Sequence, residues 1–166
     1  ALINLESEKI SLGIFKNLAL VYSTTLPFGI NDIIRDVSKV CSLTIEESQK
    51  IINNIDFSFQ NNQNLFDENN FLKSFYFKKT NFRKISKVLI LGVAKERIDE
   101  IFEILKKQLS IPRFNFNSGT DFLLTGKGIN LFNLKMYIAS FFNLDIAKIH
   151  LYNHRNADDL EKDFIS

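Results

Sequence analysis

The chain has 166 residues, of which 45% are hydrophobic and 24% are charged, with a formal net charge of +2. This composition is typical of one compact globular body and excludes a disordered tail. The small net charge excludes strong long-range attraction for nucleic acid, and the longest apolar runs fall short of the roughly 20 residues that a membrane-spanning helix needs.

Cys41 is the only cysteine, which excludes an internal disulfide and a cysteine-based metal cluster. A reducing, cytoplasmic environment is therefore expected. The chain begins at Ala1, inside an apolar run and without an initiator methionine, so we expect a piece of a longer protein.

The N-terminal segment predicts an antiparallel meander, because three runs alternate apolar and polar residues. These runs are Ala1–Leu5, Ile10–Phe15 and Leu18–Thr25. Pro27 and Gly29 end the extended segment, and Asn31 or Asp32 is a candidate cap for a helix that reaches about Val40.

Thr44 and Glu47 form a capping box, which predicts a second helix over Ile45–Asn54. Residues 53–70 are rich in Asn and Gln, which favours a loose surface insertion. A short strand is then expected over Phe71–Phe77.

The longest predicted helix runs from Asn81 or Phe82 to Leu109, where apolar residues recur at helical spacing, and Pro112 marks its exit. The remaining elements are a strand at Phe122–Leu124, a glycine turn at Gly126–Gly128, a helix at Leu131–Phe142 and a strand at Ile146–His150. Together they predict a right-handed crossover unit.

Several other patterns have ordinary structural explanations. His150 and His154 are four residues apart, but no carboxylate or cysteine completes a metal site with them. Cys41 is expected to be a small core residue. Asp158, Asp159 and Glu161 suit the acidic first turn of a helix. The seventeen Phe residues follow helical and strand periodicity, which favours a core over nucleic-acid stacking.

Four segments, in order along the chain, resemble motifs of the bacterial cell-division protein family FtsA. They are Leu26–Val37, Ile45–Ile51, Val93–Glu103 and Leu123–Gly128. The resemblance implies an α/β (α+β) fold, the second lobe of an actin-like (ribonuclease H-like) protein, with a mixed sheet, flanking helices and a small inserted subdomain. The expected division is 1–30 and 110–166 for the sheet lobe and 31–109 for the helical subdomain.

The same resemblance implies a site for ATP and magnesium. Its contacts would fall on Asn4 in the first hairpin, on Gln49 in the second helix, and on the adenosine loop formed by Thr125, Gly126, Lys127 and Gly128. Taken alone, the Gly-x-Gly of this loop is more often a plain tight turn, and Lys127 an exposed turn lysine.

Departures from the family pattern argue against hydrolysis. Asn4–Ile10 replaces a glycine-rich phosphate loop and contains two glutamates, and Ile52 stands where the family has a polar contact. At an effective dielectric constant of about 20, a carboxylate roughly 4 Å from a phosphate charge costs on the order of 4 kcal/mol. Weak triphosphate binding and no ATPase activity are therefore expected.

By resemblance, the partners are the C-terminal peptide of the tubulin-like protein FtsZ and further copies of the same protein in filaments. The implied peptide-binding residues are Arg83, Lys84, Glu96, Arg97 and Glu100, although charge pairs on a helix need no function. An acidic peptide would suit the basic stretch from Lys78 to Lys87. The implied location is the cytoplasmic face of the inner membrane at the division site, with attachment through segments outside this chain.

Two other functions are compatible with the sequence. A PilM-type actin-like scaffold of pilus or secretion assembly shares the glycine motifs, so the partner distinguishes it from the FtsA type. An active ATPase or sugar kinase of the same superfamily would show ATP turnover, which the altered Asn4–Ile10 segment argues against.

Overall fold

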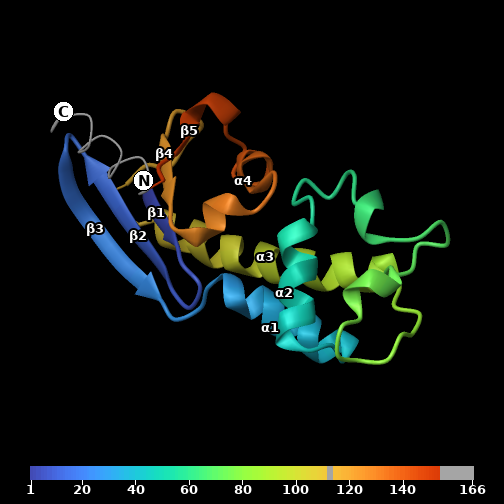
Figure 1. Cartoon of the computed structure of the whole chain (residues 1–166). Coiled ribbons are helices and arrows are strands. Elements are labelled where there is room, and N and C mark those ends of the chain that lie inside the picture. The colour runs from blue at the N-terminus through green and yellow to red at the C-terminus, as the bar shows by residue number, and fades with distance from the viewer. Residues whose placement is uncertain (112–113, 154–166) are drawn as a thin grey trace, which may run out of the picture.

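The computed structural model describes residues 1–111 and 114–153, and its centre is a five-stranded mixed sheet (Figure 1). The strand order is β3-β2-β1-β4-β5. The strands are β1 (Leu2–Leu5), β2 (Ile10–Lys16), β3 (Ala19–Leu26), β4 (Phe122–Thr125) and β5 (Ile149–Leu151). The first three form the expected antiparallel meander, while β4 and β5 run parallel to β1.

The helices gather on one side of the sheet (Figure 1). They are α1 (Ile30–Cys41), α2 (Ile45–Asn54), α3 (Lys87–Leu109) and α4 (Leu134–Phe141). Alternate strand residues such as Ile3, Leu12 and Ile14 face the core and are buried. The core is therefore one continuous cluster between the sheet and these helices.

The other face of the sheet has a different character. Phe15 and Leu20 are 47% and 56% exposed, and Leu123 is also exposed. Two shallow hollows of about 490 and 340 Å³ lie over this face. The edge strand β3 contains no charged residue, and its pairing with β2 is shifted by a bulge at Ile14/Phe15.

The first two helices begin close to the predicted positions. Gly29, not Asn31 or Asp32, is the N-cap of α1, and its N–H donates to Asp32 Oδ2 at 2.8 Å. The predicted capping box of α2 is confirmed, because Glu47 N–H donates to Thr44 Oγ1 and Thr44 N–H to Glu47 Oε2.

Residues 53–70 are not a loose insertion. Phe57, Leu65 and Phe66 are buried in the common core, and a 3-10 turn, η1 (Gln63–Leu65), lies between them. Asn62 is buried, whereas the other Asn and Gln residues of this range are exposed. Its side chain accepts from the N–H of Asp56 at 2.7 Å and donates to the carbonyl of Asp56 at 3.1 Å.

Two further predictions between α2 and α3 were wrong. Phe71–Phe77 contains only isolated bridges and a 3-10 turn, η2 (Ser74–Tyr76), instead of a strand. The long helix begins at Lys87, after the N-cap Ser86, because the carbonyl of Ile85 accepts from Leu72 N–H at 2.9 Å.

The last helix and the last strand are shorter than predicted. A 3-10 turn, η3 (Lys127–Asn130), follows β4, and the left-handed Asn133 delays α4. Another turn, η4 (Ile146–Lys148), occupies the start of the predicted last strand. The parallel order β1-β4-β5 confirms the crossover unit, and the boundaries at 30 and 110 remain a prediction. No helix among residues 1–111 and 114–153 has the length and apolarity to cross a membrane.

Candidate functional site

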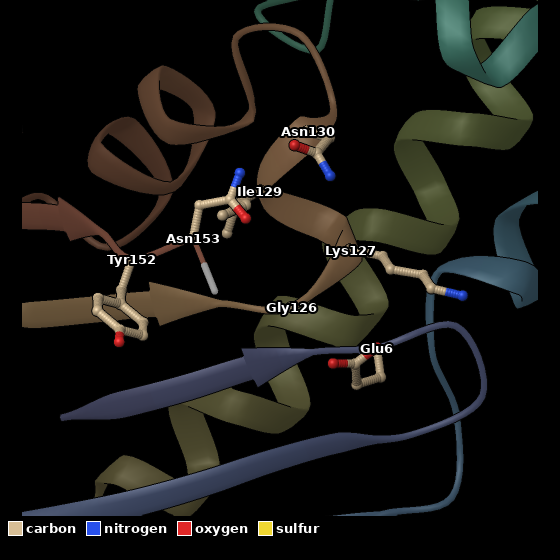
Figure 2. A pocket seen from close by; sticks show the side chains of 7 residues that line it. All are labelled: Glu6, Gly126, Lys127, Ile129, Asn130, Tyr152 and Asn153. Carbon is tan, nitrogen blue, oxygen red and sulfur yellow. The ribbon is translucent and has the colours of Figure 1, made fainter. Parts of the chain in front are cut away.

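A pocket of about 400 Å³ opens where the β1–β2 turn meets the segment after β4 (Figure 2). It is lined by Glu6, Gly126, Lys127, Ile129, Asn130, Tyr152 and Asn153. In Figure 2, Glu6 lies on one side and Asn130 on the other, while the Lys127 side chain extends away from Tyr152. The predicted adenosine loop therefore forms one wall of a real cavity.

Close packing against β1 requires the two glycines of this loop. Gly126 has a φ of +89°, and a Cβ on it would lie 2.5 Å from both Asn4 Oδ1 and the carbonyl oxygen of Leu5. A Cβ on Gly128 would lie 2.7 Å from Leu5 Cβ. Glycine is thus demanded here by backbone conformation and space, whether or not a ligand binds.

Asn4 and Thr125 lie side by side, although neither lines the Gly126 pocket. They are paired in register on β1 and β4, directly before Gly126. Asn4 Oδ1 and Thr125 Oγ1 are buried and have no hydrogen-bond partner among the residues described. Buried polar atoms without a partner are uncommon in folded proteins.

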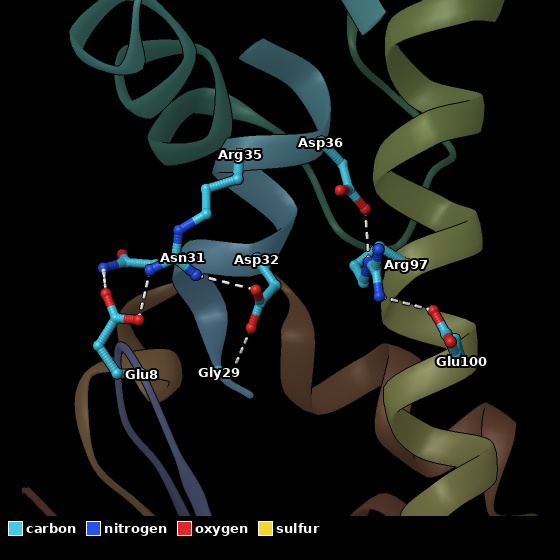
Figure 3. Close-up of polar contacts among 8 residues, drawn as sticks. All are labelled: Glu8, Gly29, Asn31, Asp32, Arg35, Asp36, Arg97 and Glu100. Carbon is cyan, nitrogen blue, oxygen red and sulfur yellow. Dashed lines mark hydrogen bonds and ion pairs between the residues drawn. The ribbon is translucent and has the colours of Figure 1, made fainter. Parts of the chain in front are cut away.

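The β1–β2 turn separates its two glutamates. Glu6 lines the pocket, whereas Glu8 accepts hydrogen bonds from Asn31 Nδ2 at 2.5 Å and from Arg35 (Figure 3). The hydrogen bond from Arg35, followed by that from Asn31, lowers the pKa of Glu8. Only Glu6 therefore presents its carboxylate to the pocket.

The N-terminus of α1 is occupied by the same turn. The N–H groups of Ile30 and Asn31 donate to the carbonyl oxygens of Glu6 at 3.1 Å and Ser7 at 2.9 Å. A Cβ on Gly29 would lie 2.5 Å from each of these oxygens, so only glycine permits this approach. At many helix N-termini the first N–H groups bind an anion, but here two of them already donate to backbone carbonyl oxygens of the β1–β2 turn.

The α2 helix contributes nothing to this pocket. Gln49 is exposed on α2, away from the residues that line the pocket, and Ile52 is buried in the core. The sequence motif placed both near a nucleotide, and the structure does not bring either one to the Gly126 loop.

The buried Glu47 was recognised from the sequence only as a helix cap. In the structure its Oε1 also accepts the N–H groups of Lys78, Lys79 and Thr80 at 2.8–2.9 Å. Burial favours a raised pKa, but these backbone hydrogen bonds and that from Thr44 outweigh it and lower the pKa of Glu47 to about 2. No local signal at 78–80 revealed this contact, because it joins segments over thirty residues apart.

Three of the predicted partner-binding residues lie together on α3. Arg97 Nε donates to Asp36 on α1 at 2.5 Å, and its Nη1 donates to Glu100 at 2.8 Å (Figure 3). Glu96 joins them around a hollow of about 210 Å³. The Arg97 charge is thus balanced by carboxylates of the chain itself.

The other two partner-binding residues lie elsewhere. Arg83 donates to the carbonyl oxygens of Cys41 and of Ser42, the latter at 2.7 Å, and so satisfies the C-terminus of α1. Lys84 lies over the ring of Phe71 at 5.6 Å. The five predicted residues therefore belong to two different surfaces.

Cys41 and His150 make ordinary structural contacts. Cys41 is buried, and burial raises the pKa of its thiol. His150 Nε2 lies 3.2 Å from Asp121 Oδ1, and no group of three metal-ligating side chains occurs in the described part of the chain. Pro112, His154, Asp158, Asp159 and Glu161 lie outside the described residues.

Comparison with solved structures shows an actin-like fold. The matches include the ethanolamine utilization protein EutJ from Carboxydothermus hydrogenoformans, with a TM-score of 0.56 and 10% identity over 90% of this chain and 42% of that one. The PilM–PilN type IV pilus biogenesis complex matches with a TM-score of 0.60 and 11% identity over 92% of this chain and 34% of that one. MreB 5 of Spiroplasma citri bound to AMPPNP matches with a TM-score of 0.60 and 14% identity over 93% of this chain and 47% of that one. No family model and no curated protein matches the chain.

These comparisons confirm the expected actin-like lobe with a mixed sheet. At identities of 10–14% they show the fold alone, and none of the three proteins is an FtsA. The chain spans less than half the length of each of these structures.

Proposed function

We propose that this chain is one lobe of an actin-like scaffold that binds other proteins, assembles with copies of itself, and does not hydrolyse ATP. The β1–β2 turn carries the proposal. Its carbonyls already accept the α1 donors, and its Glu6 carboxylate faces the pocket. Both features oppose a bound triphosphate electrostatically.

Residual nucleotide affinity is proposed for the nucleoside end, with Thr125, Gly126, Lys127, Gly128 and Asn4 as contacts and no role for Gln49. MreB 5 was solved with AMPPNP, so the actin-like fold admits nucleotides in a complete protein. A phosphate-release assay on the full-length protein with ATP and magnesium tests the proposal. No turnover above buffer is expected, and sustained turnover would establish an active ATPase instead.

The partner we propose is the C-terminal peptide of FtsZ, bound by an FtsA-type adaptor on the cytoplasmic face of the inner membrane at the division site. The motifs at Leu26–Val37 and Val93–Glu103 support this assignment. The contacts would lie between Lys78 and Glu100, near Arg83, Lys84, Glu96, Arg97 and Glu100. Membrane attachment would come from segments outside this chain.

A PilM-type scaffold of pilus assembly is the second candidate, favoured by the fold similarity to PilM in its complex with PilN. Pull-down with an FtsZ C-terminal peptide and with the N-terminal peptide of a pilus inner-membrane protein distinguishes the two. Retention of the FtsZ peptide alone supports the FtsA type, and retention of the pilus peptide alone overturns it.

A further inference from the structure

An exposed phenylalanine with two lysines over its ring lies apart from the nucleotide pocket. Phe75 is 59% exposed, and the Nζ atoms of Lys78 and Lys50 lie 4.4 and 5.1 Å from its ring centroid. Lys50 comes from α2, whereas Phe75 and Lys78 come from the segment between α2 and α3. Figure 1 shows this segment at the end of the molecule away from the sheet.

Buried contacts hold the backbone that carries these three side chains. The buried Glu47 carboxylate holds the backbone N–H of Lys78, and Lys50 follows Glu47 on the same helix. Phe75 packs edge-on against the buried Tyr76, with ring centroids 5.3 Å apart. A ligand would therefore meet a surface that is already ordered, which lowers the entropic cost of binding.

The charges of this surface are only partly balanced. Lys79 is paired with Glu46 at 2.7 Å, but neither Lys50 nor Lys78 forms an ion pair with a residue in the described ranges. Two ammonium groups at one ring repel each other, and a carboxylate near both would relieve that repulsion. Desolvation by a bound chain would also strengthen the cation–π contacts.

We propose that Phe75, Lys50 and Lys78 form a docking surface for an acidic peptide. A carboxylate of the peptide would contact the two amines, and a neighbouring apolar side chain would cover the Phe75 ring. This docking surface deepens the proposed function, and it rests on that function because both require a protein partner. It moves the main contact from Arg83 and Arg97, whose donors are already used within the chain.

Peptide is favoured over single-stranded nucleic acid by the extent of the surface. Nucleic acid needs successive stacking rings along a continuous basic groove. Here the other exposed ring of the segment, Phe82, packs edge-on against Phe77, and the Glu46 carboxylate lies next to the lysines. The chain as a whole carries a net charge of only +2.

Fluorescence anisotropy on the full-length protein tests this surface. The probe is a labelled peptide alternating Asp or Glu with Leu or Phe, and its control replaces every acid with Lys. Saturable binding of the acidic peptide is expected, weakened by salt. Phe75→Ala and the pair Lys50→Glu with Lys78→Glu are each expected to weaken it about tenfold or more.

Lys16→Glu supplies the matched control, because it makes a charge reversal at an exposed position on the sheet. Its affinity should stay within about twofold of wild type, since exposed charges beyond a Debye length are screened. Circular dichroism melting checks that every variant folds.

The proposal is overturned if the Phe75 and lysine variants bind the acidic peptide as tightly as wild type does. It is also overturned if the basic peptide binds equally well, or if a single-stranded oligonucleotide displaces the acidic peptide. Pull-down of the FtsZ C-terminal peptide by the full-length protein carrying Phe75→Ala separates the two proposals. Undiminished capture would remove this surface and leave the proposed function standing.

Discussion

A single buried carboxylate, Glu47, joins α2 to the chain that precedes α3. It accepts backbone N–H groups from Thr44, Lys78, Lys79 and Thr80, and the Thr80 hydroxyl lies 3.1 Å from both of its oxygens. Hydrogen bonds to a buried charge are stronger than neutral ones, and leaving the donors unpaired would be costly. Glu47 is therefore a main stabiliser of the segment between the two helices.

Glu47→Gln should lower the free energy of unfolding by about 2 kcal/mol, because the amide keeps one oxygen acceptor and loses the charge. The pKa of this carboxyl is lowered from 4.5 to about 2. Its stabilisation is thus fully present above pH 4.5 and is lost as the pH falls towards 2. Urea unfolding at a series of pH values measures both effects.

Glu46→Gln is the matched control for that substitution. Glu46 is exposed and makes one ion pair with Lys79, so its loss should barely change the free energy of unfolding. Equal midpoints and equal acid sensitivity for the two variants would contradict the role assigned to Glu47.

Two glycines of the chain should respond to alanine with opposite signs. Gly126→Ala should cost about 2 kcal/mol or more, because φ is +89° and the new Cβ meets Asn4 and Leu5. A Cβ added at Gly92 inside α3 would meet no atom within 4 Å beyond the adjacent residues and helix backbone, so Gly92→Ala should gain about 0.5–1 kcal/mol. Denaturant midpoints check both, and a neutral Gly126→Ala would remove the packing explanation.

At the scale of elements, the β1–β2 turn and the start of α1 form one unit. The turn carbonyls accept the first α1 donors, and Glu8 is linked to Asn31 and Arg35. This unit directs one glutamate towards the pocket and the other towards the helix. The charge presented to a nucleotide is therefore set by Glu6.

Glu6→Gln in the full-length protein should raise the affinity for magnesium and an ATP analogue by roughly tenfold, since it removes a like charge beside the phosphates. Glu8→Gln should leave this affinity unchanged, because Glu8 is held against α1. Calorimetric titration of both variants measures the difference. Unchanged affinity in Glu6→Gln would mean that the carboxylate is not what limits binding.

Sequence reasoning succeeded for elements whose signals are local. The strand alternation of Ile10–Phe15 and the Thr44 capping box both depend on neighbours in the chain, and both were found. The start of α3 was misplaced because the carbonyl of Ile85 bonds with Leu72, which no helical periodicity reveals. Residues 53–70 were misjudged because the buried Phe57, Leu65 and Phe66 lie among exposed Asn and Gln residues, so that composition alone resembles a surface loop.

The candidate site divides in the same way. Asn4 lies beside Thr125 and Gly126 because β1 pairs in parallel with β4, and of the predicted residues only Gly126 and Lys127 line the pocket. Gln49 was assigned by a motif alone, and its place on the exposed side of α2 keeps it from the pocket. The orientation of Glu8 depended on Arg35, a contact across 27 residues.

At the scale of the whole molecule, the sheet separates a packed face from an open one. Phe122 is fully buried, and its ring centroid lies 5.1 Å from that of Phe142, which follows α4. Phe15, on the opposite face, is about half exposed. The hydrophobic contribution of each ring should follow the area it removes from water.

Phe122→Ala should therefore cost about 3–5 kcal/mol, as expected for a large-to-small change in a core. Phe15→Ala should cost less than about 1.5 kcal/mol, because nearly half of that ring already meets solvent. Thermal and urea unfolding of the two variants give the comparison. Equal losses would show that Phe15 is covered in the full protein in solution.

The bulge between β2 and β3 limits how far another strand can pair with β3. An uncharged outer strand exposes a row of backbone donors and acceptors on which a foreign strand can align. The bulge at Ile14/Phe15 interrupts the regular spacing of hydrogen-bonding groups that another strand would have to match. Pro27, which has no N–H, follows the other end of β3. An uninterrupted set of backbone hydrogen bonds with another strand could thus extend only from Tyr22 to Leu26. Strand β3 therefore disfavours edge-to-edge β-aggregation despite its lack of charge.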